Sequence, residues 1–195
     1  MKFIRGAILA LLLLPALVWA GLTNAQLSTL KAAIAADSNL NQHPNNGDGN
    51  AEIAAKLNVL ATPDKFIWRS SITRSQIYHS TSAEATTWSW STYKAQSVTE
   101  QNAWTQMFMG DSVDPSLDNL RAGVAAIFTG SAQQNAQRDH VYAVAKRKAT
   151  RAEALFAVGT GSQAVPAKLG VGTLGEYIEG LLSTDEIERA RNFPG

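Results

Sequence analysis

The chain lacks cysteine entirely, and this absence removes several classes of chemistry at once. None of its 195 residues can form a disulfide, supply a thiolate ligand to zinc or act as a thiol nucleophile. An excess of charge is also missing: beyond residue 20 the chain carries 15 Lys and Arg against 16 Asp and Glu, because Lys2 and Arg5 account for two of the 17 basic residues. A net charge of −1 implies no polyanion partner such as nucleic acid. No repeat of fixed period is visible, and beyond residue 20 no apolar run is long enough to span a membrane.

The first 20 residues have the pattern of a secretory signal peptide. Lys2 and Arg5 form a positive start, residues 7–18 are almost continuously apolar, and the Val-Trp-Ala sequence that ends at Ala20 suits signal peptidase. This apolar run is too short for a comfortable membrane span. We therefore expect cleavage after Ala20 and a mature chain of about 175 residues, a length typical of a single domain with a sizeable core.

Four capping boxes mark helix starts along the chain. In each box a hydroxyl accepts from the third backbone N–H, while the third side chain reaches back to the N–H of the cap. The boxes are Thr23 with Gln26, Ser97 with Glu100, Ser131 with Gln134, and Ser183 with Glu186. The first box also has a hydrophobic staple formed by the leucines on either side of it.

Helical patterns dominate the chain, and we expect a mainly α fold: a single helical domain over residues 21–195 with a small β element in the middle. The expected helices cover residues 24–36, 51–58, 98–109, 115–128 with proline near its start, 132–158 ending at Gly159, 174–182 and 184–192. Residues 65–71 form the best strand candidate, and 72–79 predict one or two helical turns. Large and small residues alternate over 88–93, which predicts a strand or hairpin.

The sequence Asn-Asn-Gly-Asp-Gly-Asn at residues 45–50 resembles a calcium-binding loop. Placing Asp48 at the fifth position of such a loop puts Pro44 at the first and Ala55 at the twelfth, and neither supplies the required side-chain oxygen. We interpret the segment as structural. Its two glycines are expected to supply positive φ, and Asp48 or Asn50 is expected to cap the helix that follows.

No other segment predicts a catalytic, cofactor or metal site. The Gly-Thr-Gly-Ser sequence at 159–162 follows a helix instead of preceding one and lacks the lysine of a phosphate-binding loop, so a helix C-cap and turn are expected there. His43, His79 and His140 are far apart, and no pair has the i, i+4 spacing of helical metal ligands. We expect no enzyme, no metal and no cofactor.

Two groups of side chains are candidates for protein contacts. We interpret the tryptophans as core and interface anchors instead of a ligand cage. Trp88 and Trp90 would also lie on the same side of the expected strand, with Tyr93 beyond them, and could form an exposed strand edge that pairs with a partner. Arg147 and Arg151 would share one face of the expected long helix. That face is either an ordinary solvated surface or a surface for an acidic partner.

Several segments in a fixed order carry a family resemblance over nearly the whole mature chain. They are Leu22–Leu27, Pro44–Asn50, Trp68–Ser71, Asn119–Gly123, Ala149–Phe156 and Gly159–Ser162. In their order and spacing the chain resembles a little-characterised family of proteins encoded among the virion structural genes of tailed bacteriophages and prophages. The resemblance implies a non-enzymatic virion component near the head-tail junction, assembled in the host cytoplasm, with copies of itself and other virion proteins as partners and no membrane contact for the mature chain.

The leader conflicts with this resemblance, because members of the family begin close to Leu22 and an exported protein would miss virion assembly. Residues 1–20 either come from a mis-called upstream start, with translation beginning near Val18, or were gained by a prophage gene that now makes an exported protein. We favour the first explanation. The alternative function is a periplasmic or secreted binding protein that uses the aromatic segment, and a hydrolase ranks third because no acid-base pair has a recognisable spacing.

Overall fold

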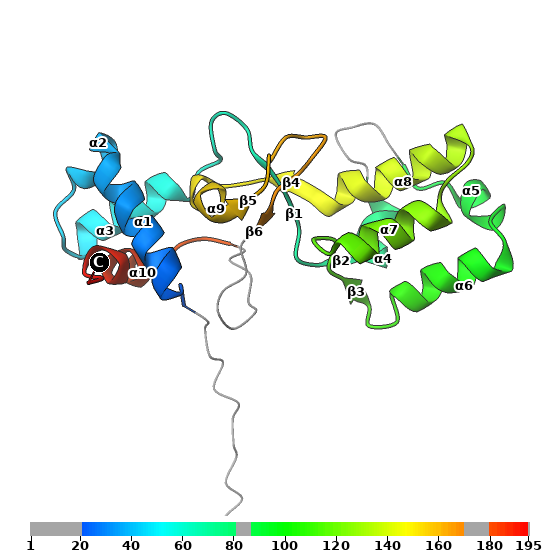
Figure 1. The fold of residues 1–195 in the computed structure, drawn as a ribbon, viewed down its shortest axis with the longest axis horizontal. Helices are drawn as coiled ribbons and strands as arrows, with labels where there is room; N and C mark the ends of the chain where they lie inside the picture. Colours follow the sequence, from blue (N-terminus) through cyan, green and yellow to red (C-terminus); the bar gives the residue numbers. More distant parts are fainter. Residues whose placement is uncertain (1–20, 81–86, 170–179, 195) are drawn as a thin grey trace, which may run out of the picture.

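The computed structural model describes residues 21–80, 87–169 and 180–194. The leader expected at 1–20 and most of the helix expected at 174–182 lie outside the described residues. Within those ranges the chain is mainly helical with a few short strands, which confirms the expected fold class. Figure 1 shows an elongated molecule in which two groups of helices lie on either side of a small layer of strands.

The first group, the aliphatic lobe, is formed by helices from both ends of the chain. Its members are α1 (Asn24–Ala36), α2 (Ser38–Asn41), α3 (Gly47–Leu57), α9 (Arg151–Phe156) and α10 (Thr184–Arg191). Helix α10 packs against α1 and α3, so the C-terminal segment closes the lobe (Figure 1). The core consists mostly of Leu, Ile and Ala, including the fully buried Leu30, Ile53 and Ile187.

The second group, the aromatic lobe, is formed by the middle of the chain. Its elements are β2 (Ile72–Thr73), α4 (Arg74–His79), α5 (Trp90–Lys94), α6 (Val98–Met107), β3 (Ser112–Val113), α7 (Asp118–Ile127) and α8 (Ala132–Ala145). Strands β2 and β3 pair in antiparallel fashion. Trp104, Phe108 and Phe128 are fully buried at the centre of this lobe.

A small layer of strands joins the two lobes. Strand β1 (Phe66–Trp68) pairs antiparallel with β4 (Lys146–Lys148), and β5 (Ala157–Val158) pairs antiparallel with β6 (Lys168–Leu169). A parallel bridge between Ile67 and Ala167 connects the two pairs. The strand expected within 65–71 is therefore confirmed as β1, and it has a small buried cluster of its own around Ile67.

All four predicted capping boxes are present with both of their hydrogen bonds. The first helix spans Asn24–Ala36, as predicted, and the helical turns expected within 72–79 are found as α4. Two further boxes, Thr73 with Gln76 and Thr150 with Glu153, start α4 and α9. Each box pairs backbone N–H groups that a helix start would otherwise leave without a partner. A capping box in the sequence is therefore a good predictor of where a helix begins.

The single long helix expected over 132–158 is wrong. Helix α8 ends at Ala145, the next three residues form β4, and a new helix begins after Thr150. Residues 146–148 no longer make helical hydrogen bonds, and their backbone groups are satisfied by pairing of β4 with β1. The capping box at Thr150 then starts α9. Gly159 has a positive φ of 114°, but it follows strand β5 and does not cap a helix.

The strand or hairpin expected over 88–93 is also wrong, because these residues lead into helix α5. The hydroxyl of Ser89 accepts from the backbone N–H of Thr92 at 3.2 Å and caps the helix. Trp88 precedes this cap and enters the core. The alternation of large and small residues therefore reflects one buried ring and one surface ring near a helix start, not the two faces of a strand.

Several expected helix boundaries also need correction. Helix α3 begins at Gly47, and its cap is Asn46, which accepts from Gly49 N at 2.9 Å. Neither glycine of this segment has positive φ; instead, a Cβ on Gly49 would lie 2.1 Å from the carbonyl oxygen of Pro44. Helix α7 begins at Asp118, so the proline expected in its first turn lies outside it. Helix α6 ends at Met107 instead of 109, and α2 lies in a segment expected to be a loop.

Candidate functional site

A continuous cluster of aromatic rings runs from the core of the aromatic lobe to its surface. Trp88 lies at its centre, 5.3 Å from Trp104 in a stacked arrangement and 4.8 Å from Tyr78, measured between ring centroids. The indole N–H of Trp104 donates to the hydroxyl of Tyr78 at 3.0 Å. These contacts connect α4 and α6 with the residue that precedes the cap of α5, and they hold the rings in fixed positions.

Trp90 forms the surface end of this cluster. Its ring centroid lies 4.8 Å from that of Tyr78 and 6.0 Å from that of Tyr93, and 50% of its surface is exposed. The hydroxyl of Tyr93 in turn donates to the carbonyl of Gln101 on α6 at 3.4 Å. Trp90 therefore presents a large apolar face to solvent while its neighbours fix its position.

The three aromatic candidates consequently have different positions. Trp88 is only 8% exposed and belongs to the core. Tyr93 is half-buried, and Trp90 is the member that a partner could reach. Because residues 90–94 are helical, the free strand edge expected between the two tryptophans does not exist.

The two basic candidates, Arg147 and Arg151, lie on different elements and do not share a face. Arg147 is in β4, and its two terminal nitrogens donate to the two carboxylate oxygens of Glu153 at 2.7 and 2.5 Å. Arg151 is the first residue of α9 and pairs with Asp37 at 2.7 Å. Both arginines therefore connect parts of the fold to one another.

Glu153 is the fully buried partner of this arrangement. Burial acts to raise the pKa of its carboxyl group, but hydrogen bonds from Arg147, Thr150 and Gly180 outweigh that effect and hold the pKa below its ordinary value. The backbone N–H groups of Thr150 and Gly180 donate at 2.9 and 3.1 Å. This carboxylate thus joins β4, the start of α9 and the segment that leads to α10.

The 45–50 segment, considered for calcium, receives an arginine instead. Arg191 donates to the carbonyl oxygens of His43 and Pro44 and to the side-chain oxygen of Asn50, each at 2.8 Å. Asn50 is almost completely buried. Arg191 therefore fixes the last turn of α10 against the residues just before the 45–50 segment and against Asn50 in the first turns of α3.

The three histidines have separate environments. His140 is fully buried on α8 and its Nε2 lies 2.8 Å from the carbonyl of Ile77. His43 contacts Lys56, and Nδ1 of His79 contacts the carbonyl of Ser75. His43 lies in the segment between α2 and α3, His79 is the last residue of α4, and His140 is on α8.

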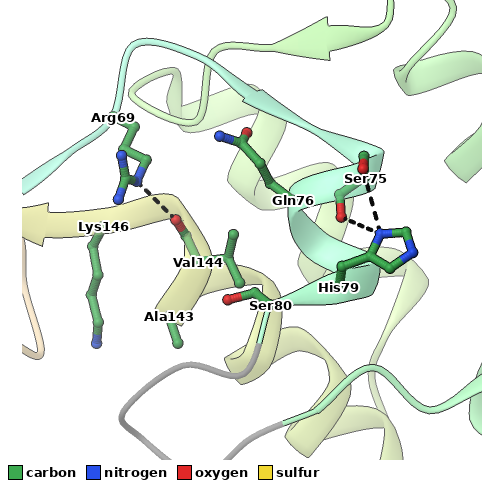
Figure 2. A pocket seen from close by; sticks show the side chains of 8 residues that line it. All are labelled: Arg69, Ser75, Gln76, His79, Ser80, Ala143, Val144 and Lys146. Atoms are coloured by element: carbon green, nitrogen blue, oxygen red, sulfur yellow. Dashed lines mark hydrogen bonds between the residues drawn. The ribbon is translucent and has the colours of Figure 1, made fainter.

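A cleft beside α4 was not predicted from the sequence (Figure 2). It has a volume of about 550 Å³. The lining comes from the residue after β1, from α4 and its C-cap, from the end of α8 and from the start of β4. The residues are Arg69, Ser75, Gln76, His79, Ser80, Ala143, Val144 and Lys146. The only sequence signal was the Thr73–Gln76 capping box, because the remaining residues are brought together by the packing of α4 on α8.

Comparison with family models, with curated proteins and with solved structures finds no significant match. In residues 21–80, 87–169 and 180–194, no three His, Asp or Glu side chains gather in a way that could hold a metal ion. Over the same ranges, no helix combines the length and apolar character needed to cross a membrane. The aromatic surface at Trp90 and the cleft beside α4 are therefore the features from which a function can be argued.

Proposed function

We propose that the protein is a non-enzymatic structural component of a phage or prophage virion, positioned near the head-tail junction. It acts by packing against copies of itself and against neighbouring virion proteins. The observation that carries this proposal is Trp90, half exposed on a cluster of rings that already holds it in place. The order of sequence segments from Leu22 onward supports the virion context.

Trp90 has the properties of an interface anchor. Tryptophan is enriched among the residues that carry most of the binding energy at protein interfaces. Contacts with Tyr78 and Tyr93 restrict its side chain before any partner arrives, so little rotamer entropy remains to be lost on binding. A further exposed apolar side chain in the same lobe, Val98, would add contact area.

Replacement of Trp90 alone tests this role. Trp90→Ser should abolish self-association, or attachment to particles, in light scattering coupled to size-exclusion chromatography, with an unchanged far-UV circular dichroism spectrum. Met109→Ser is the matched control, because Met109 is 80% exposed in the same lobe but makes no contact in the ring cluster. Association of Trp90→Ser equal to that of the parent would refute the proposed surface.

The signal-peptide pattern of residues 1–20 favours a second candidate, an exported binding protein that uses the same aromatic surface. Cell fractionation with mass spectrometry of the N-terminus separates the two. A cytoplasmic protein that begins between Val18 and Leu22 supports the virion component, whereas a periplasmic or secreted protein that begins at Gly21 supports export. Portal, capsid or tail genes beside the gene would support the first candidate independently.

A further inference from the structure

The cleft beside α4 contains a set of hydrogen-bond donors whose other contacts leave them directed at the open space. Arg69 is held at the end of α8, where its Nε donates to the carbonyl of Val144 at 3.1 Å and its backbone N–H donates to that of Ala145 at 2.8 Å. The two terminal guanidinium nitrogens of Arg69 have no hydrogen-bond partner among the described residues. The part of Arg69 that recognises anions best is therefore available in the cleft.

Gln76 contributes a second donor with a defined orientation. Its Oε1 accepts from the backbone N–H of Thr73 at 2.7 Å in the capping box of α4. Because this bond uses the oxygen, Nε2 is the end of the amide that stays available, and Figure 2 shows it pointing to the side of the cleft where Arg69 lies. The cap that starts α4 thus also orients a donor.

The remaining polar groups complete the lining. The hydroxyl of Ser80 has no partner among the residues that the structure describes. Lys146 lies at the edge of the cleft, where its Nζ donates to the carbonyl of Gln163 at 3.2 Å. Ser75 and His79 contact each other. None of the eight described residues that line the cleft is an Asp or Glu, so the described part of the lining offers mainly hydrogen-bond donors.

We propose that this cleft binds an oxyanion, a phosphate group or a carboxylate, between Arg69 and Gln76. A guanidinium with free terminal nitrogens binds two oxygens of such a group, and an amide N–H and a hydroxyl can satisfy others. The oxyanion can come from a free small anion or from a carboxylate side chain of a second copy of the chain. The first source goes beyond the proposed function, and the second would identify part of the contact through which copies assemble.

Gln76→Glu tests the site with little risk to the fold, because glutamate also completes a capping box. The change keeps the acceptor for Thr73 but replaces the donor in the cleft with a negative charge. Gln26→Glu is the matched control, since it makes the same change in the capping box of α1 in the other lobe. The probe is sodium phosphate, compared with sodium chloride at equal ionic strength, and the readout is the NMR shift of the Ser80 amide and the Arg69 Nε–H.

Phosphate should shift these two signals in the parent and in Gln26→Glu, and Gln76→Glu should weaken the binding at least about tenfold through charge repulsion. Arg69→Gln provides a second variant and should weaken it to a similar extent. Shifts no larger than those with chloride, together with self-association that is unaffected in both cleft variants, would overturn the proposal. Phosphate binding by Gln76→Glu equal to that of the parent would overturn it as well.

Sedimentation velocity separates the two sources of the oxyanion. Loss of self-association in Gln76→Glu but not in Gln26→Glu identifies a carboxylate of a second copy. Unchanged self-association with loss of phosphate binding identifies a free anion. Trp90→Ser should bind phosphate like the parent. If the proposed function is wrong, Trp90→Ser will still self-associate; if the proposed anion site is wrong, the parent will show no phosphate-specific shift. The two results can therefore be told apart.

Discussion

The two lobes are built from different side chains and from different parts of the chain. The aliphatic lobe buries Leu, Ile and Ala from helices near both ends of the chain, together with α9. The aromatic lobe buries Trp, Tyr and Phe rings from one nearly continuous stretch between Trp68 and Ala145. Local contacts close at a small entropic cost, whereas joining distant segments requires closure of long loops. We therefore expect the aromatic lobe to fold with a smaller loss of chain entropy than the aliphatic lobe, because its contacts join segments that are closer in the sequence.

The aliphatic lobe compensates with long polar side chains that tie its distant segments together. Arg191 seats α10 on the 43–50 segment, and Lys31 of α1 donates to the carbonyl of Phe193 at 2.7 Å. Arg151 joins α9 to Asp37, and the Asn39 amide and this arginine hold the pKa of the Asp37 carboxyl below its ordinary value. The aromatic lobe instead carries the surface tryptophan and the donor-lined cleft. Both features for which a function is proposed, Trp90 and the cleft beside α4, therefore lie in the lobe whose core is made of aromatic rings.

The largest effect on this comparison is expected from Trp104→Ala. Trp104 is fully buried and contacts Trp88, Phe108 and Phe128, so its removal leaves a large cavity and should lower the free energy of unfolding by about 3–5 kcal/mol. Urea unfolding followed by circular dichroism measures the loss. A change below about 1 kcal/mol would show that the ring cluster is not the core of this lobe.

Glu153→Gln should have the next largest effect, on the connection between the strand layer and the aliphatic lobe. It removes the carboxylate that Arg147 faces, and a cost of about 2–3 kcal/mol is expected, near the low end for breaking a buried pair because Arg147 keeps some contact with water. Beyond residue 20 the tryptophans are Trp88, Trp90 and Trp104 of the aromatic lobe and Trp68 of β1, whose ring packs into the core of that lobe. Their fluorescence therefore reports mainly the aromatic lobe, while circular dichroism reports both. The loss should be larger by circular dichroism; equal shifts by both probes would mean that the lobes unfold as one unit.

The same residue predicts a pH dependence. The pKa of Glu153 is lowered in the folded protein, so its contribution is complete above the ordinary glutamate pKa and disappears as the pH falls through the lower folded value. Stability of the parent should therefore decrease on acidification more steeply than that of Glu153→Gln. Parallel stability curves of the two proteins from neutral to acidic pH would contradict this assignment.

The smallest effect is expected from the caps, and it should be similar in the two lobes. Ser131→Ala and Thr23→Ala each remove a hydroxyl that accepts from a backbone N–H at a helix start, and each should cost about 0.5–2 kcal/mol. Thermal melts of both variants provide the measurement. A melt of Ser131→Ala that is unchanged within error would show that the cap of α8 contributes nothing to stability.

Local signals in the sequence predicted the helix starts well, because a capping box needs only residues that are close together in the chain. Thr23, Ser97, Ser131 and Ser183 all cap the helices expected of them. The boxes at Thr73 and Thr150 carry the same pattern and could have been found in the same way. Recognition of the second one would have divided the long helix correctly.

Local sequence determined the helical class, the capped helix starts and the strand at residues 66–68, since these depend on neighbouring side chains and backbone groups. Tertiary structure decided the rest. Lys146–Lys148 became a strand because β1 offers its backbone groups for pairing. Trp88 became core while Trp90 stayed at the surface because Trp88 packs between Tyr78 of α4 and Trp104 of α6, whereas Trp90 contacts the ring of Tyr78 but not that of Trp104. The cleft between Arg69 and Gln76 likewise exists only because α4 packs on α8. Such contacts join residues far apart in the chain, and their energy depends on the partner that folding brings to them.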